Sequence, residues 1–325
     1  MNAIENYKRS RQILFELAEI HPQSKIVSTK GPVENVHFLE MGQGKPLIIV
    51  HGGGSHASEW VNIMKPLAEH FHLYVVDRPG HGLSDPFNYQ SVAYKKIAVE
   101  FLRSFADVLG LEKFHLMGNS MGGYYSLAFS MAHPEKINKL LLIGAPAGVN
   151  RWVPPMLRIL GLKGINQLIT KTVARPSIAN MKMVYKKLLV ADIKNLSDEY
   201  LSHGLHNGLL PGNMMGFTSM LENVLTLKGW RSELYLGDKL HSLEVPVRFI
   251  WGTQDVFEKP DTGMAKASVI ADYKFAVVKD AGHCPWLDQP EECARLIISF
   301  LDEKAGASHG YLSENPMISG NKIYQ

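Results

Sequence analysis

The sequence predicts an α/β fold, namely a doubly wound, mostly parallel sheet with a helical cap inserted. Short apolar runs recur along the chain, most of them ending in glycine or a turn, and helical stretches separate them. Such runs are typical of strands that are buried on both faces of a parallel sheet. Regular alternation of strand and helix indicates βαβ units. This alternation breaks in the middle of the chain, which indicates an insertion between two strands.

The apolar runs give the expected order of the elements. Strands are predicted over residues 33–40, 46–50, 73–76, 114–117, 140–143, 247–251 and 275–278. Helices are predicted over roughly 58–69, 91–109, 121–133, 260–271 and 289–303. Before the sheet, a short amphipathic helix is expected to lie on the main body through one shared face, formed by Ile13, Leu14, Leu17 and Ala18.

The break in the alternation divides the chain. Residues 1–146 and 241–304 are predicted to form the α/β core, and residues 147–240 a helical cap or lid. The tail, residues 305–325, is polar and contains glycine and serine, so we expect it to be peripheral.

Composition excludes several classes of protein. The chain of 325 residues is 46% hydrophobic and 20% charged, which is ordinary globular composition. A formal net charge of +3 is too mild to indicate nucleic-acid binding. Two cysteines make no disulfide framework, and neither a signal peptide nor a transmembrane segment is recognisable. We therefore expect a cytoplasmic protein, with contact to a membrane surface and homo-oligomerisation left open.

The strongest local motif is Gly118-Asn119-Ser120-Met121-Gly122, which follows an apolar run and opens a helical stretch. This is the context of a nucleophile elbow, in which a strained turn holds a serine hydroxyl above the sheet. Glycines two residues before and after the serine leave the room that so tight a turn needs. The alternative is an ordinary glycine-rich turn, but the setting favours Ser120 as the nucleophile.

A serine hydroxyl needs a base, and the base needs an orienting acid. His283 is preferred among the 14 histidines because it follows the last predicted strand. Asp255 follows the strand that ends near residue 251, whereas no acid directly follows the strand 140–143. The order serine, aspartate, histidine along the chain is that of hydrolases with a nucleophile elbow.

An oxyanion would need backbone N–H donors. One is expected from Met121, at the start of the helix after the nucleophile. The second is expected from the glycine cluster after the strand 46–50, with Gly53 favoured and Gly54 close behind.

These motifs together resemble the α/β-hydrolase superfamily. They are His51-Gly52-Gly53-Gly54, Asp77-Arg78-Pro79-Gly80-His81-Gly82, Gly118-Asn119-Ser120-Met121-Gly122-Gly123, Trp251-Gly252-Thr253-Gln254-Asp255 and Gly282-His283. The elbow is similar to that of the meta-cleavage-product hydrolases, which split carbon–carbon bonds, and this resemblance places Asn119 near the oxyanion site. The chain differs from those enzymes at Cys284, where they carry a tryptophan.

The cap is expected to set specificity. Six methionines fall between residues 156 and 220 and would suit an adaptable apolar pocket, although helix packing is the simpler explanation for most of them. Residues 151–194 carry nine lysines and arginines against one acid, which fits an anionic substrate, an anionic membrane or a solvated face. The pocket candidates are Gly54, Asn119, Trp152, Trp286 and Arg151, the last of these for a substrate carboxylate.

The main functional hypothesis is a serine hydrolase of small or medium ester or acyl substrates that works through an acyl-enzyme, without cofactor or metal. Carbon–carbon bond hydrolysis is the alternative chemistry. A non-catalytic ligand-binding receptor on the same fold is the alternative of another class.

Overall fold

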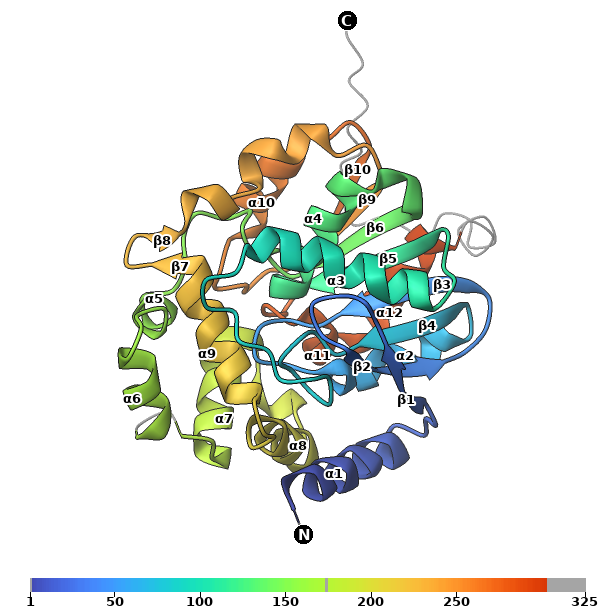
Figure 1. Cartoon of the computed structure of the whole chain (residues 1–325). Helices are drawn as coiled ribbons and strands as arrows, with labels where there is room; N and C mark the ends of the chain where they lie inside the picture. The colour runs from blue at the N-terminus through green and yellow to red at the C-terminus, as the bar shows by residue number, and fades with distance from the viewer. Residues whose placement is uncertain (1, 173–174, 303–325) are drawn as a thin grey trace, which may run out of the picture.

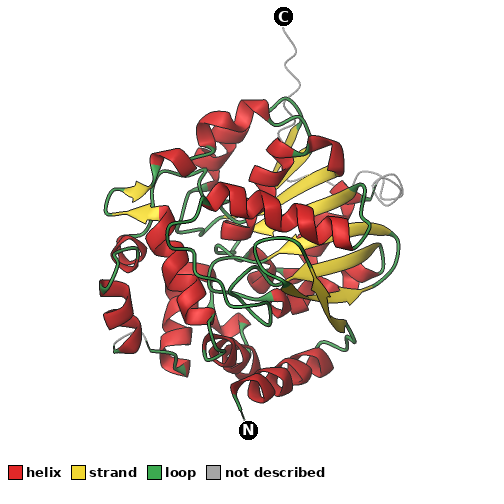
Figure 2. Cartoon of the chain, in the orientation of Figure 1, coloured by secondary structure: helices red, strands yellow, loops and turns green. Residues whose placement is uncertain are grey.

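The computed structural model describes residues 2–172 and 175–302, and it has an eight-stranded sheet with helices on both faces (Figures 1 and 2). The strand order is β1-β2-β4-β3-β5-β6-β9-β10. Strands β1 and β2 pair antiparallel, β2 pairs antiparallel with β4, and every other neighbouring pair in this sheet is parallel. The predicted mostly parallel, doubly wound sheet is therefore confirmed. The predicted peripheral tail lies outside the described residues.

The strands of the sheet are β1 (Gln23–Ser28), β2 (Asn35–Met41), β3 (Lys45–Val50), β4 (Phe71–Val76), β5 (Phe114–Asn119), β6 (Ile137–Ile143), β9 (Val247–Gly252) and β10 (Tyr273–Val278). Each predicted strand has its counterpart. Strand β1 was missed because it lies at the sheet edge with most of its side chains exposed, so its sequence carries no apolar run.

Two helical layers enclose the sheet. One face is covered by α3 (Tyr94–Val108), α4 (Ser120–Ala132) and α10 (Pro260–Ala267), and the other by α2 (Val61–Ala68) and α12 (Pro290–Leu301). Strand β3 shows why its sequence is a continuous apolar run. Ile48 and Val50 pack into the first layer and Leu47 and Ile49 into the second, all without solvent exposure.

The insertion between β6 and β9 is mainly helical, as predicted. It contains α5 (Pro155–Leu160), α6 (Ile165–Lys171), α7 (Ile178–Val184), α8 (Asp198–Gly208), α9 (Asn213–Val224) and a small hairpin of β7 (Leu225–Thr226) and β8 (Gly229–Trp230). These helices lie together along one side of the sheet (Figure 1). The division into core and cap at residues 147 and 240 stays a prediction.

Helix α1 (Ala3–Leu17) packs beside α8 (Figure 1), and a hydrogen bond of 2.9 Å between Ser10 Oγ and His203 Nδ1 joins the two. Its buried residues are Tyr7, Ser10, Arg11, Leu14 and Phe15. The predicted contact face was therefore partly wrong, because Ile13 and Leu17 are exposed to solvent. The buried face instead meets α8 through Ser10, the first two strands through Arg11, and the apolar core through Leu14 and Phe15.

This arrangement predicts different costs for two leucines of one helix. Leu14 is 4% exposed and Leu17 is 63% exposed. We expect Leu14→Ala to lower the free energy of unfolding by about 3 kcal/mol, since it leaves a cavity in the core. The matched control Leu17→Ala should change it by less than about 0.5 kcal/mol in urea titrations. Equal losses in the two variants would contradict the observed orientation of the helix.

Candidate active site

Ser120 stands at the junction of β5 and α4 in a strained backbone conformation. Its φ is 50°, in the left-handed region that residues other than glycine rarely adopt. The surrounding packing enforces this turn: a Cβ atom on Gly118 would lie 2.4 Å from the carbonyl oxygen of Gly122, and one on Gly122 would lie 2.1 Å from that of Val50. The need for glycine on either side of Ser120, predicted from the sequence, thus has a direct steric cause.

His283 and Asp255 come from the loops that follow β10 and β9, and they meet. Nδ1 of His283 donates a hydrogen bond of 2.9 Å to Oδ2 of Asp255, and both side chains are buried. The same carboxylate accepts hydrogen bonds of 2.9 Å from the amides of Ala145 and Phe257. These donors fix the carboxylate, and the carboxylate fixes the orientation of the imidazole ring.

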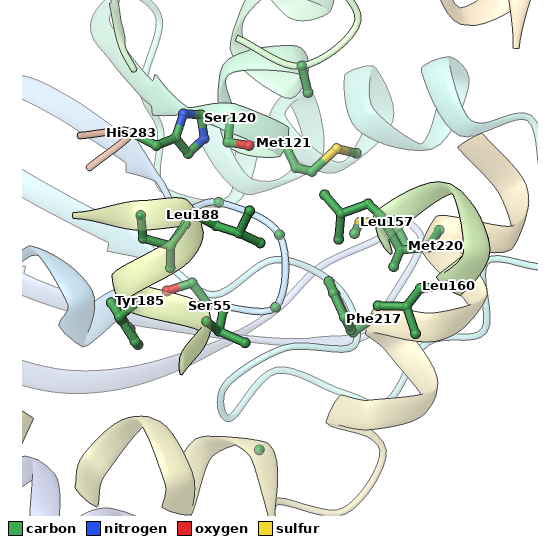
Figure 3. A pocket seen from close by; sticks show the side chains of 18 of the residues that line it. Ser55, Ser120, Met121, Leu157, Leu160, Tyr185, Leu188, Phe217, Met220 and His283 are labelled. Carbon is green, nitrogen blue, oxygen red and sulfur yellow. The ribbon is translucent and has the colours of Figure 1, made fainter. Parts of the chain in front are cut away.

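Ser120 and His283 line one cavity, and the close-up draws the imidazole ring beside the serine side chain (Figure 3). Nε2 of His283 is buried and has no hydrogen-bond partner within residues 2–172 and 175–302. The ring of Phe257 packs against the ring of His283 with 4.1 Å between centroids. The structure therefore brings the three predicted residues together, with a free ring nitrogen on the side of the serine.

Asn119 connects three segments of this site. Its Nδ2 donates to the carbonyl oxygens of Ile143, at 2.7 Å, and of His283, at 3.2 Å. Its Oδ1 would lie 2.7 Å from a Cβ atom on Gly52. Asn119 therefore lies beside the glycine loop, and its side chain ties the elbow to the histidine loop. Its predicted place near an oxyanion site stays a prediction.

The glycine loop after β3 is held from two sides. The amide of Gly52 donates to Oε1 of Glu59 at 3.2 Å, and the guanidinium of Arg78 donates to the carbonyl oxygen of Gly52 at 2.7 Å. Gly53 and Gly54 follow, and both line the cavity, as does Met121 at the start of α4. Gly54 has φ 71° and lies against the ring of Phe217, so a side chain there would be strained.

The cavity has a volume of about 300 Å³. Apolar side chains of α5, α7 and α9 form part of its wall, among them Leu157, Leu160, Phe217 and Met220 (Figure 3). Five of the six methionines of this region contribute, namely Met156, Met181, Met183, Met214 and Met220. The pocket interpretation of these methionines therefore fits better than simple helix packing.

Three predicted pocket residues lie elsewhere. The Arg151 side chain is exposed, pairs with Asp238 at 2.9 Å and lies over the ring of Tyr235, so it does not reach the cavity. Trp152, next to it, is half exposed to solvent. Trp286 is fully buried and stacks on Trp60 with 4.1 Å between centroids, because the short helix α11 (Pro285–Asp288) turns its side chain into the core.

Residues 47–296 match the family model described as "Alpha/beta hydrolase family". The chain belongs to the alpha/beta hydrolase family. It is 30% identical over 282 residues to the 2-hydroxy-6-oxononadienedioate/2-hydroxy-6-oxononatrienedioate hydrolase of Escherichia coli strain K12, and the match covers 85% of this chain and 93% of that protein. The predicted similarity of this hydrolase to the meta-cleavage-product enzymes is thereby confirmed.

Solved structures agree on the fold. A carboxylesterase from Bacillus subtilis superposes with a TM-score of 0.75 at 21% identity, covering 93% of this hydrolase and 99% of that chain. A meta-cleavage product hydrolase from Pseudomonas fluorescens superposes with a TM-score of 0.69 at 20% identity, covering 87% and 98%. The fold is thus shared by ester hydrolases and carbon–carbon bond hydrolases alike.

Two features do not occur among the described residues of this hydrolase. No helix there is both long and apolar enough to cross a lipid bilayer. No group of three histidine, cysteine, aspartate or glutamate side chains there is arranged to hold a metal ion.

Glu59 is a feature of the site that the sequence did not reveal. It lines the cavity, is buried, and accepts hydrogen bonds from Gly52 N and Ser55 Oγ on either side of Gly53. Burial raises the pKa of Glu59 to about 7, although those two hydrogen bonds lower it. A single glutamate at the start of a helical stretch looks like a solvated residue, so no sequence pattern could have marked it.

The buried carboxyl group predicts a pH-dependent stability. The pKa of Glu59 is higher in the folded state than its ordinary value of 4.5, so its contribution to stability falls as pH rises from 4.5 to about 7. A glutamine in its place would accept from Gly52 and donate to Ser55 without carrying a charge. We expect Glu59→Gln to match wild type near pH 4.5 and to exceed it by about 3 kcal/mol above pH 7 in urea unfolding. A stability difference that does not change with pH would contradict this.

Proposed function

We propose that this hydrolase cleaves uncharged esters with an apolar acyl portion, through an acyl-enzyme on Ser120. The observation that carries the proposal is the Asp255–His283 hydrogen bond, with the unpartnered Nε2 of the same ring on the side of Ser120. A nucleophile, a base and an orienting acid in one cavity are the requirements of acyl transfer.

The proposed reaction has two halves. In the first, Oγ of Ser120 attacks the ester carbonyl carbon and its proton passes to Nε2 of His283. The tetrahedral intermediate collapses, the bond to the leaving alkoxide breaks, and the imidazolium returns the proton to that oxygen. In the second, His283 takes a proton from a water molecule, whose oxygen attacks the acyl carbon. The acid then leaves and Ser120 regains its proton.

Two backbone amides are proposed to hold the oxyanion. The amide of Met121 lies in the first turn of α4, where N–H groups have no helical acceptor and the helix dipole favours negative charge. The amide of Gly53 is the second, because the preceding amide of Gly52 is already engaged by Glu59. Asn119 is proposed as a positioning residue, since it binds the carbonyl oxygen of His283.

The charge of the cavity supports an uncharged substrate. Arg175 is the only lysine or arginine among the described residues that line the cavity, and it is exposed. Glu59 contributes a carboxyl group, and burial lowers the pKa of His81 to about 3, so that ring is neutral. A buried substrate carboxylate would need a partner that these residues do not supply.

Carbon–carbon bond hydrolysis is the second candidate. Its support is the 30% identity with the Escherichia coli enzyme, whose name specifies a dioate, a substrate with two carboxylates. The apolar lining and the buried Glu59 favour the ester over such a dianion. A non-catalytic receptor is less well supported, because it would have no use for the complete Asp255–His283 pair.

The nucleophile can be tested by labelling with a fluorophosphonate. We expect wild type to be labelled and Ser120→Ala to be unlabelled. Ser55→Ala is the matched control, because Ser55 is the other serine among the described residues that line the cavity. Labelling that survives in Ser120→Ala but disappears in Ser55→Ala would show that Ser55 is the nucleophile instead.

The orienting acid can be tested separately. Asp255→Asn should fold normally but lower kcat for a p-nitrophenyl ester by about ten-thousand-fold.

Substrate charge separates the two chemistries. We expect p-nitrophenyl butyrate to be hydrolysed with a kcat/KM at least about tenfold above that of an ester whose acyl chain ends in a carboxylate, because the charged end meets an apolar wall. A vinylogous 1,5-diketone that carries carboxylates should turn over more slowly still, in spectrophotometric assays. Fast cleavage of the diketone beside slow cleavage of both esters would favour the carbon–carbon hydrolase instead.

A further inference from the structure

The helices around the cavity carry an unusual set of exposed apolar side chains. The large hydrophobic residues exposed between residues 152 and 183 are Trp152, Met156, Ile159, Ile165, Leu168, Ile178 and Met183. Leu168, on α6, is 65% exposed. Helices α5, α6 and α7 form one flank of the molecule (Figure 1), and we call this set of side chains the apolar rim. Exposed apolar side chains concentrated in one segment of a chain indicate an interaction site more often than scattered ones do.

The apolar rim borders the cavity. Met156, of α5, and Met183, of α7, both line the cavity and are exposed to solvent, and the same holds for Arg175 between α6 and α7. Helices α5 and α7 therefore contribute both to the cavity wall and to the apolar rim.

Charge is distributed unevenly around the same flank. Residues 151–194 carry nine lysines and arginines and one acid, which leaves 25 cations and 30 acids in the rest of the chain. Lys163, shortly before α6, and Lys171, at its end, are exposed and form no ion pair with any residue of the described ranges. The segment that carries the apolar rim is thus net positive, and the rest of the chain is net negative.

We propose that the apolar rim, with the lysines beside it, docks the enzyme on an anionic lipid surface, from which apolar esters enter the cavity. The inference rests on the proposed function only for the identity of the substrate. Docking itself follows from the combination of apolar and cationic side chains on one exposed flank.

Charge complementarity favours a lipid surface over the alternatives. Short helices with apolar residues on the outside and lysine or arginine nearby are suited to the bilayer interface, where the apolar groups enter the headgroup region. Each lysine near an anionic membrane adds attraction that falls off within a Debye length. A face that only contacts solvent would account for the lysines but not for the exposed Leu168 and Ile165. The rest of the chain is net negative and is repelled by an anionic membrane, so this flank is the one that faces the lipid.

Sedimentation with vesicles tests the proposal on the full chain. We expect wild type to bind vesicles of equal parts phosphatidylcholine and phosphatidylglycerol, to bind pure phosphatidylcholine far less, and to be released by salt. The double variants Ile165→Ser/Leu168→Ser and Lys163→Gln/Lys171→Gln should each lower the partition coefficient by about tenfold. None of these four residues lines the cavity, so hydrolysis of a soluble p-nitrophenyl ester should be unchanged.

Matched controls come from other faces of the molecule. Leu17, on α1, is 63% exposed, and Leu17→Ser should leave the partition coefficient as in wild type. Lys274 and Lys279, on β10 and just after it, are exposed, and Lys274→Gln/Lys279→Gln should also bind normally.

Three results would overturn the proposal: wild type that does not sediment with anionic vesicles, equal losses in the control variants, or binding that is indifferent to lipid charge. If wild type does not sediment with anionic vesicles but still hydrolyses soluble esters, the proposed function stands and the docking proposal fails. The apolar rim would then be interpreted as a contact for another protein. Loss of ester hydrolysis with vesicle binding intact would count against the proposed function alone.

Discussion

The site depends on the backbone strain at Ser120. A non-glycine residue with φ 50° persists only where its surroundings enforce it. Here the buried strand β5 fixes one side of the turn, helix α4 fixes the other, and Gly118 and Gly122 remove the side chains that would push them apart. The strain directs the serine hydroxyl to the edge of the sheet where the loops after β9 and β10 also end.

The second organising feature is a loop held by opposite charges. Arg78 binds the carbonyl oxygen of Gly52 from one side, and Glu59 binds its amide from the other. These contacts leave the amides that follow Gly52 in a fixed position next to the elbow. The same Glu59 places a carboxyl group in the cavity wall, so one residue both holds the loop and lines the cavity.

The inserted helices turn this chemical centre into an enclosed apolar cavity. They provide five methionines, whose unbranched and flexible side chains suit an adaptable apolar wall. The outer surface of the same helices is apolar and basic. The cavity wall and the exposed apolar side chains therefore belong largely to the same segment of the chain.

The sequence by itself determined the strands β2 to β6, β9 and β10, the elbow at Ser120 and the chain positions of Asp255 and His283, because buried strands and tight turns leave local patterns of apolar residues and glycine. Only the tertiary structure decided which distant side chains share the cavity. The tertiary structure places Arg151 and Trp286 outside the cavity lining and places Glu59 within it. The orientation of a side chain on a loop or short helix depends on packing partners that are far away along the chain. The hydrophobic periodicity of the sequence does not identify these partners.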